Sequence, residues 1–401
     1  MQGFSISVCS LVLVSALILT NEIEIGAADK TFSVLDYGAI GDGFTDDTSA
    51  FEKAWTDACN TEEGASTITV PEGKTYNLNP INFAGPCKSS VNLEVSGTII
   101  APKDPNAWNG HDSSKWLTFE SVDELTVSGQ GSFDGQGDGW WNISCKLNPE
   151  PGCNKRAPTM LRFESCNELT LQDVGFKNSP QTHVAVAGSS DVHLKSLTIS
   201  APDLSPNTDG IHLQESSDVS VQDSKIGSGD DCISIGDRVS DIRITNIDCG
   251  PGHGISIGSL GKSGNEVDVK NIEVRKVTFH KTTNGARIKT WQVGRGQVSH
   301  ILFSNLEFTE VENPIIIDQY YCETRYGNWG SNNDVKYQEA FGTSSTEVAI
   351  NLNCSHNVPC TNIGLDDIEL DSAVEGAELI SSCNNAFGTA EGTVQPNSCL
   401  Q

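Results

Sequence analysis

The sequence predicts an all-β fold, a parallel β-helix, and three observations point to it. Short segments that alternate apolar and polar residues recur through the middle of the chain, as expected for strands with one buried face. The first apolar positions of six of them, 169, 192, 219, 242, 272 and 301, are 23 to 30 residues apart, a period typical of a solenoid. Thirty-eight glycines and only two methionines also fit a turn-rich β protein. The predicted strands are 91–95, 124–127, 168–171, 191–194, 218–221, 241–244, 271–274 and 300–303.

Parallel stacking of successive rungs is favoured over an antiparallel sandwich. Second apolar runs, such as 197–199 and 233–235, follow most of the first runs. This order gives two or three strands per coil, and each coil adds strands to the coil below at roughly 4.8 Å. Because no helical pattern lies between the strands, an array of βαβ units is disfavoured as well.

Both open ends of a solenoid need a cap. An apolar helical face predicts a short N-terminal capping helix over 49–58, and Ser49 with Glu52 resembles a capping box. The cysteine-rich tail after Cys354 is expected to close the other end. The residues that share the apolar face of the helix are Ala50, Phe51, Ala54 and Trp55.

The N-terminal residues read as a secretory signal. The apolar stretch 8–20 is too short to span a bilayer, and no later segment is apolar enough to cross one. We therefore expect a signal peptide over approximately 1–28 and a single domain over 29–401. The stretch 135–158, rich in Gly, Pro and Cys, is expected to be a surface loop that forms a wall of a cleft.

Composition limits the partners of the chain. A hydrophobic fraction of 37% over 401 residues is enough to bury a sizeable core. The formal charge of −28 argues against nucleic acid and against an anionic membrane surface, which both require clustered Lys and Arg. A polyanionic substrate would be repelled at long range, so it must be held by local cations or met at low pH.

Cysteine usage predicts disulfides. Cys9 lies in the predicted signal, which leaves an even number of the 13 cysteines in a secreted chain. Thiols bound to a metal are disfavoured because no CxxC pair accompanies a matching His pair. Two sequons predict N-glycosylation at Asn142 and Asn353. The expected pairs are Cys232–Cys249, Cys354–Cys360 and Cys383–Cys399, then Cys59–Cys87 and Cys145–Cys153, with Cys166 and Cys322 unassigned.

Four polar clusters interrupt the apolar ladder at about one rung apart. If each rung is one period, they stack on neighbouring coils along one face. Stacked carboxylates repel each other, so at least one of them has a raised pKa and stays protonated near neutral pH. A protonated acid beside an ionised one is what glycoside hydrolysis requires. The clusters are Asn207-Thr208-Asp209, Gly229-Asp230-Asp231, Gly252-His253-Gly254 and Arg287-Ile288-Lys289.

Basic residues complete this predicted site. Arg287 and Lys289 alternate on a strand, so both side chains point the same way and suit a uronate carboxylate. Asp230 and Asp231 would face opposite ways on a regular strand, and Gly229 is expected to permit a bend that brings both into the cleft.

Each of these features also has a bland interpretation. An Asp in a β-helix turn more often satisfies backbone amides than performs catalysis, and this is expected of four others. A metal site is a second alternative, for which the Asp-rich set suits Ca²⁺ or Mg²⁺ better than Zn²⁺. A serine nucleophile is disfavoured because no Gly-x-Ser-x-Gly elbow is present. The four predicted turn residues are Asp203, Asp218, Asp223 and Asp241.

These clusters carry a resemblance to a known family. The runs that begin at Ser205 (SPNTDG), Gly229 (GDDC), Gly252 (GHG) and Arg287 (RIK) resemble the four-motif signature of the glycoside hydrolase family 28 polygalacturonases. The opening VLDYGAIGDGFTDDT at 34–48 resembles the one that family shares with related pectin-degrading β-helices. The similarity extends from about residue 32 to the C-terminal cysteines.

The resemblance implies a single-stranded, right-handed parallel β-helix and an inverting hydrolysis that uses no metal and no other cofactor. By position, Asp230 matches the general acid of the family. Asp209 and Asp231 match the pair that activates the water. His253 matches the histidine that tunes the acid or positions the substrate.

The resemblance also implies the substrate, the homogalacturonan of pectin. Arg287 and Lys289 match the residues that bind galacturonate at the cleavage point. Tyr321 resembles the substrate-binding tyrosine, with Tyr320 as the competing alignment, and Asn207 is a further expected substrate contact. The expected protein is a monomer secreted to the cell wall.

Two other functions remain open at this point. A non-catalytic wall protein would use the same cations to hold oligogalacturonate without cutting it. A pectate lyase would depend on Ca²⁺ and yield unsaturated products. The sequence does not decide between endo and exo cutting, or how methyl esters are tolerated.

Overall fold

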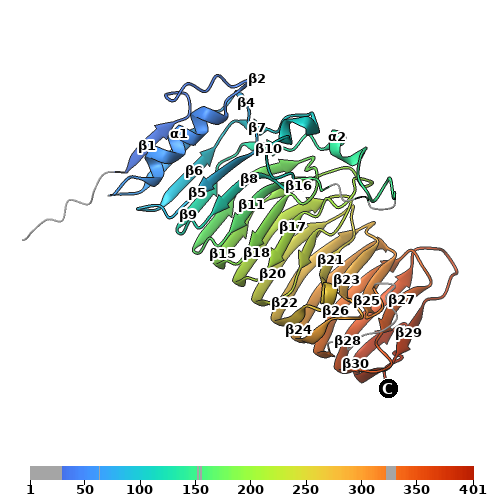
Figure 1. The fold of residues 1–401 in the computed structure, drawn as a ribbon. Coiled ribbons are helices and arrows are strands. Elements are labelled where there is room, and N and C mark those ends of the chain that lie inside the picture. Colours follow the sequence, from blue (N-terminus) through green and yellow to red (C-terminus); the bar gives the residue numbers. More distant parts are fainter. Residues whose placement is uncertain (1–28, 63, 151–152, 154–155, 322–330) are drawn as a thin grey trace, which may run out of the picture.

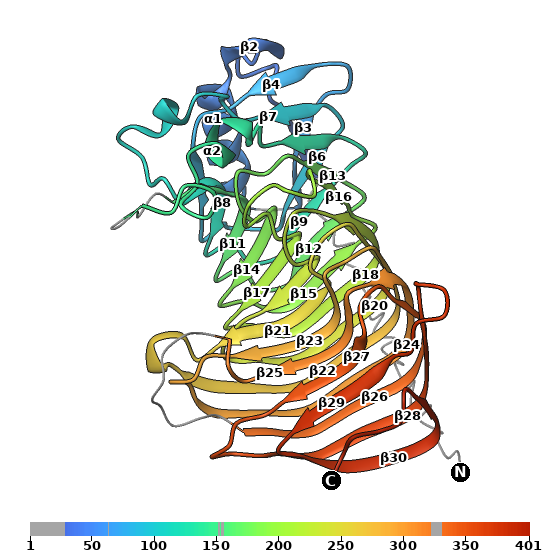
Figure 2. The same cartoon turned by 90° about the vertical axis from the view of Figure 1, so that its right-hand side faces the viewer.

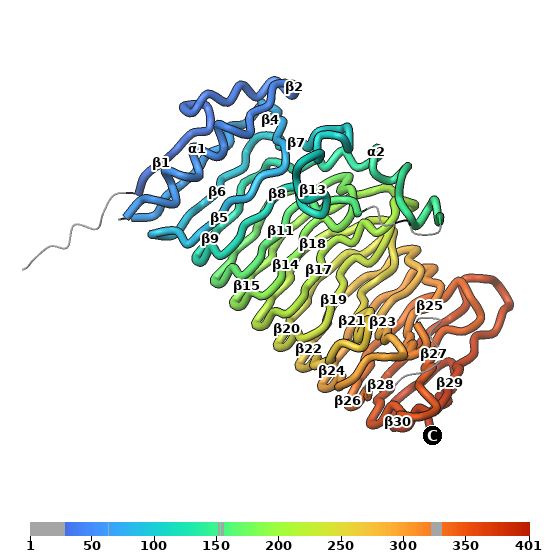
Figure 3. Tube along the Cα trace, viewed as in Figure 1, coloured from blue at the N-terminus to red at the C-terminus, as the bar shows by residue number. Residues whose placement is uncertain are grey.

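The computed structural model describes residues 29–401 except 63, 151–152, 154–155 and 322–330. The predicted signal peptide and Cys322 therefore lie outside the described residues. The chain winds into a right-handed parallel β-helix, whose coils follow one another in sequence order from α1 to β30 (Figures 1 and 3). Every strand pairing among the described residues is parallel, which rejects the antiparallel sandwich.

The larger sheet, called sheet A, contains every strand predicted from the alternating pattern. Its strands lengthen toward the C-terminus, because two strands of an early coil merge into one in later coils. They are β1 (Lys30–Ser33), β2 (Asp42–Asp46), β3 (Ser66–Val70), β4 (Thr75–Asn77), β6 (Val91–Val95), β7 (Thr98–Ile100), β9 (Leu125–Ser128), β10 (Ser132–Asp134), β12 (Leu169–Gln172), β13 (Gly175–Lys177), β15 (Ser190–Lys195), β16 (Thr198–Ser200), β18 (Ser217–Gly227), β20 (Val239–Cys249), β22 (Glu266–His280), β24 (Arg295–Val311), β26 (Ser331–Ser344), β28 (Cys360–Ser372) and β30 (Ala386–Gln395).

A second sheet, sheet B, forms another wall of the coil (Figure 2). Its strands are short and pair one to one between consecutive coils, so each outward side chain lies beside its equivalent in the next coil. They are β5 (Ile81–Ala84), β8 (Lys115–Glu120), β11 (Thr159–Glu164), β14 (Val184–Ala187), β17 (Ile211–Gln214), β19 (Ile233–Ile235), β21 (Ile255–Leu260), β23 (Asn284–Thr290), β25 (Asn313–Asp318), β27 (Val348–Asn353) and β29 (Ile380–Asn384).

The core consists of like side chains stacked from coil to coil. Ile242 pairs in register with Val219 on one side and Ile272 on the other, and all three are at most 2% exposed. Aromatic rings stack in the same way: the centroids of Phe119 and Phe163 are 5.4 Å apart with nearly parallel planes. Each fully buried side chain of this size contributes about 1.5–3 kcal/mol, so the ladder holds the coils in register.

Three aspartates bend the long strands of sheet A. Asp218, Asp223 and Asp241 adopt left-handed φ angles of 51° to 60°, which Asp and Asn tolerate better than most residues. The prediction that they are turn residues is wrong, because β18 and β20 continue through these left-handed positions. Asp223 and Asp241 accept hydrogen bonds from asparagine side chains of the next coil. Asp203 lies exposed in a turn ahead of β17.

Helix α1 (Thr48–Cys59) covers the N-terminal end of the stack and buries the four predicted apolar residues. The predicted capping box is wrong, because Ser49 lies inside the helix and the N-cap residue is Asp47. The Asp47 carboxylate does not cap the helix; it accepts hydrogen bonds from the backbone amides of Ile40 and Gly41. Sequence reasoning missed this because the partner loop lies before the helix.

The C-terminal tail closes the opposite end as further coils, formed by β28, β29 and β30 and clasped by two disulfides. All five predicted disulfide pairs are present. The Cys166 thiol is buried and forms no disulfide among the described residues. The described residues also include two 3₁₀ turns, η1 (Pro105–Trp108) and η2 (Lys262–Gly264).

The expected loop 135–158 contains the short helix α2 (Asp138–Trp141), which is anchored by a hydrogen bond from the indole of Trp141 to the carbonyl of Ser179. The sequon residue Asn142 is exposed just after α2, whereas Asn353 is half-buried at the end of β27. Glycosylation of either stays a prediction. No helix among the described residues is long and apolar enough to cross a membrane.

Candidate active site

Three of the predicted site residues occupy equivalent positions on consecutive coils. Ile211, Ile233 and Ile255 pair in register in sheet B. Asp209, Asp231 and His253 each lie two residues before one of these isoleucines. The parallel stacking therefore brings residues that are 22 apart in sequence to one edge of the sheet.

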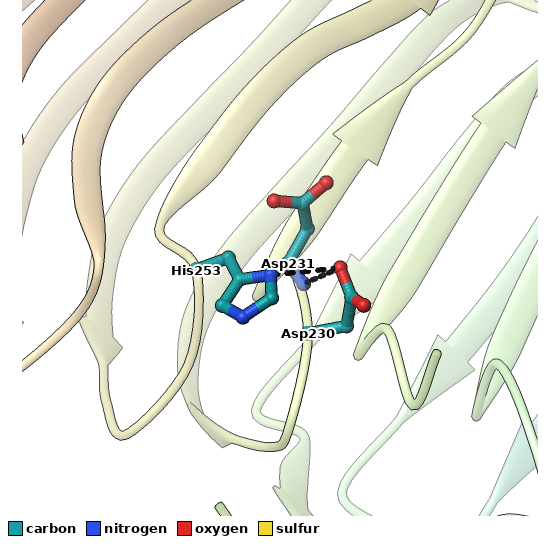
Figure 4. A group of neighbouring side chains, drawn as sticks. All are labelled: Asp230, Asp231 and His253. Atoms are coloured by element: carbon teal, nitrogen blue, oxygen red, sulfur yellow. Dashed lines mark hydrogen bonds and ion pairs between the residues drawn. The ribbon is translucent and has the colours of Figure 1, made fainter. Parts of the chain in front are cut away.

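Asp230 joins this row from the preceding position in the turn. Its carboxyl group and that of Asp231 point in different directions, and His253 faces Asp230 (Figure 4). Gly229 is needed here for lack of space: a Cβ atom at this position would lie 2.1 Å from the carbonyl oxygen of Ser205. The glycine thus permits the turn, as predicted, although through the close approach of two backbone segments.

Asp231 is held by two cations. Arg287 Nη2 lies 2.6 Å from its Oδ1, and Lys289 Nζ lies 2.8 Å from its Oδ2. Ser256 donates a further hydrogen bond to Oδ1 at 2.8 Å. All three charged side chains are at least 88% buried, so the two cations hold the carboxylate in a fixed position.

Asp209 has no such cation. Its Oδ2 accepts a hydrogen bond from Ser234 Oγ at 2.7 Å, and the same hydroxyl lies 2.7 Å from His212 Nδ1. Burial, followed by the charges of Asp230 and Asp231, raises the pKa of Asp209 to about 8. In the empty cleft Asp209 is therefore the carboxyl group that retains a proton near neutral pH.

Asp230 has the opposite electrostatics. Burial on its own would raise its pKa, but His253 and Lys146 outweigh burial and hold the pKa below its usual range. His253 Nδ1 lies 3.1 Å from Oδ1, and Lys146 Nζ lies 2.7 Å from Oδ2. The raised pKa predicted for one of the stacked carboxyl groups thus falls on Asp209, whereas the resemblance names Asp230 as the acid.

The site lies in a cleft of about 720 Å³ along sheet B. Its floor is a ladder of outward side chains in register on six consecutive strands. Asn207 and Tyr321 also line the cleft, and Lys289 Nζ lies 5.2 Å from the centroid of the Tyr321 ring. The floor ladder consists of Arg162, Ala185, His212, Ser234, Ser256 and Arg287.

The cleft is cationic although the chain is strongly acidic. Five basic residues and only three acidic ones line it. Because the acidic chain repels a polyanionic substrate at long range, we expected local cations to hold it, and the cleft contains them. The five are Lys146, Arg162, Lys262, Arg287 and Lys289.

Within the part of the chain that the structure describes, the group placed to hold a metal ion is Asp230, Asp231 and His253, whose donor atoms lie within 4.8 Å of one another. Both oxygens of Asp231 already contact buried cations. A divalent ion there would face two positive charges at close range, so the donor set fits a metal poorly.

Every predicted catalytic and substrate-binding residue lines this one cleft. Sequence reasoning missed Ser234 and Ser256, although a signal existed: each is the polar centre of an Ile-Ser-Ile triplet, and the triplets are 22 residues apart. It also missed Lys146, which is 84 residues from Asp230 and carries no local signal.

Comparison with known proteins agrees with this geometry. The family model for glycosyl hydrolases family 28 matches residues 59–395. The chain belongs to this family. It is therefore a glycoside hydrolase, and the match extends well beyond the four motifs to most of the chain.

The family 28 chain has close relatives in plants. A probable polygalacturonase from Arabidopsis thaliana is 43% identical over 378 residues, which cover 93% of this chain and 85% of the relative. A polygalacturonase from Persea americana is 44% identical over 362 residues, with 89% and 77% covered. Among solved structures, an endo-xylogalacturonan hydrolase from Aspergillus tubingensis superposes with a TM-score of 0.78 at 26% identity, covering 91% of this chain and all of that one.

Proposed function

We propose that this family 28 enzyme is a polygalacturonase that hydrolyses the α-1,4 bonds between galacturonic acid residues of pectin. One observation carries the proposal: three carboxyl groups and a cationic pair converge in a cleft that is cationic within an otherwise acidic chain. The relatives named polygalacturonase support the same activity.

The proposed reaction is a direct displacement. Asp230 donates its proton to the glycosidic oxygen as the bond from that oxygen to the anomeric carbon breaks. A water molecule attacks the anomeric carbon from the opposite face and loses a proton to a second carboxylate. The products are two shorter chains, and the configuration at the anomeric carbon is inverted.

Asp209 is better suited than Asp231 to accept the proton from water. Both oxygens of the Asp231 carboxylate already contact Arg287 and Lys289, so neither oxygen is free to accept a proton from water. Asp209 has a pKa raised to about 8, so its ionised form binds a proton strongly. We therefore assign the base to Asp209, and we assign Asp231 the role of holding the cationic pair and orienting the water.

Arg287 and Lys289 are proposed to bind the uronate carboxylate at the cleavage point. Arg287 uses Nε for Ser256 and Nη2 for Asp231, which leaves its Nη1 to donate to a ligand. Tyr321 lies over Lys289 and is 44% exposed, so its ring is available to a sugar face. Asn207, also exposed at the cleft, is a further proposed contact.

The five disulfides fit an oxidising compartment, which supports secretion to the cell wall. We also propose that the protein is a monomer, that residues 29–401 form a single domain and that the reaction uses no cofactor.

Incubation of the purified protein with polygalacturonate tests the activity. We expect reducing ends to appear at acidic pH, without ultraviolet-absorbing products and in the presence of a chelator. Ultraviolet-absorbing ends that require Ca²⁺ would instead indicate a lyase, and binding without products would indicate a non-catalytic wall protein.

The Asp230→Asn variant tests the role of the acid. We expect turnover to fall by about 10²–10⁴-fold with little change in the thermal midpoint, because Asp230 contacts partly exposed partners. A large loss of folded protein would make Asp230 structural. The anomeric configuration of the first product, read by nuclear magnetic resonance, tests inversion.

A further inference from the structure

Lys146 is a cation of the cleft to which neither the sequence motifs nor the reaction assigns a role. It follows Cys145, whose disulfide with Cys153 clasps the loop beyond α2. Its ammonium group lies 2.7 Å from Asp230 Oδ2, across 84 residues of sequence. The loop therefore delivers one positive charge to the proposed proton donor.

This ion pair differs from the one at Asp231. The side chain of Lys289 is 7% exposed and that of Arg287 is 12% exposed, so both cations are fixed by burial. The side chain of Lys146 is 44% exposed and extends from a surface loop. An exposed lysine pair is weak, so Lys146 can exchange its partner for another carboxylate at low cost.

In the enzyme without substrate, the proton is on the opposite carboxyl group from the one that the proposed reaction requires. Asp230 must carry a proton to act as the acid, but it is ionised beside Lys146, while Asp209 holds a proton. Substrate binding must reverse this order. The charged or titratable groups that face Asp230 are His253, Lys146, Asp209 and Asp231, with Arg287 and Lys289 behind Asp231.

Building on the proposed function, we propose that Lys146 is a substrate-binding residue that pairs with Asp230 in the empty cleft and transfers this pair to a galacturonate carboxylate when the substrate binds. The substrate supplies a carboxylate on each sugar, so a new partner for Lys146 arrives with it. Asp230, once it loses the cation, takes up the proton that Asp209 releases. No proton is gained or lost overall, and both groups are then in the state that the reaction needs.

The variant Lys146→Met removes the charge and keeps most of the length. We expect it to weaken the affinity for digalacturonate about tenfold by calorimetry, while Lys146→Arg stays within about twofold of the wild type. Lys177→Met is the matched control. Lys177 pairs with Asp134 at 3.3 Å with similar exposure, and it does not line the cleft.

The pH profiles separate exchange of the pair from a permanent pair. The profile of kcat/KM reports the free enzyme, and that of kcat reports the enzyme–substrate complex. In Lys146→Met the acidic limb of kcat/KM is expected to move to higher pH, because Asp230 loses a cation in the free enzyme and takes up a second proton more readily, while Asp209 is still protonated. The acidic limb of kcat is expected to stay in place, because in the complex Lys146 has already left Asp230.

Three results would overturn the proposal. If the acidic limbs of the kcat/KM and kcat profiles move equally, the Lys146–Asp230 pair persists in the complex. Unchanged binding means that Lys146 does not contact the substrate. Tighter binding means that Lys146 only blocks the cleft. If the wild type binds digalacturonate but releases no reducing ends from the polymer, the proposed function fails, and the binding comparison still decides the role of Lys146.

Discussion

Two hollows on different walls of the same coils carry aspartates, and only one has the features of an active site. The groove on sheet A, of about 570 Å³, is lined by exposed strand residues such as Asp218 and Asp241. The cleft on sheet B, of about 720 Å³, is lined by Asp209, Asp230 and Asp231. The two hollows are similar in size and in the residue type that repeats along them.

The difference between them lies in burial and in partners. The carboxylate of Asp241 accepts a hydrogen bond from Asn271 on the next coil and is open to water, and its pKa is lowered by hydrogen bonds from Ser240 and Asn271. Asp209 is withdrawn from water beside two other carboxyl groups, and its pKa is raised to about 8. A repeated acid becomes reactive when neighbouring coils bury it together with its equivalents.

The largest effect is expected from Asp231→Asn. This change leaves Arg287 and Lys289 buried without a counter-charge, which costs about 3–5 kcal/mol of stability. It also removes the group that orients the cationic pair, so kcat/KM is expected to fall by about 10³-fold or more. Denaturant unfolding and initial rates measure the two losses. A stable and active variant would remove the distinction drawn between the two hollows.

A smaller effect on the free energy of unfolding is expected from a change of pH, through the titration of Asp209. The folded pKa of Asp209, about 8, exceeds the ordinary value of 3.8, so the folded state binds the extra proton and stability falls as pH rises between these values. The buried His183 and His212 have pKa values lowered to about 4, so they act in the opposite sense, but only up to their ordinary value of 6.5. Between about pH 6.5 and 8, Asp209 is the member of these three groups that makes the stability depend on pH.

Thermal midpoints measured in that window test this expectation. The midpoint of the wild type is expected to fall as pH rises from 6.5 to about 8. The midpoint of Asp209→Asn is expected to fall less, because Asn resembles the protonated acid at every pH. Equal slopes in the two proteins would show that Asp209 is already ionised in the folded state.

The smallest effect is expected from Asp241→Asn on sheet A. Asn tolerates the left-handed φ of 60° at this position and can still accept the hydrogen bond from Asn271. We expect a change in stability of less than about 0.5 kcal/mol and no change in kcat/KM. A loss of activity here would indicate that the groove on sheet A contributes to substrate binding.

Much of the site could be predicted because a β-helix converts sequence period into spatial proximity. Asp209, Asp231 and His253 are 22 residues apart in sequence, and parallel pairing in register carries that regular spacing into the structure. The alternation of Arg287 and Lys289 also predicted that both would point the same way, and both contact Asp231.

Other features were out of reach because they depend on segments that leave the repeat. The N-cap at Asp47 is held by a loop outside the helix pattern. The contact of Lys146 with Asp230 depends on the path of a loop that carries a disulfide and follows no period. Loop geometry of this kind has no local sequence signal.

The sequence by itself determined the solenoid, the order of its coils and the set of residues that share one face. These follow from local alternation and from spacing, which any parallel stack must translate into neighbours. Only the tertiary structure decided which acid holds the proton. That outcome depends on how deeply each carboxyl group is buried and on which cation reaches it, and cations come to Asp230 and Asp231 but not to Asp209.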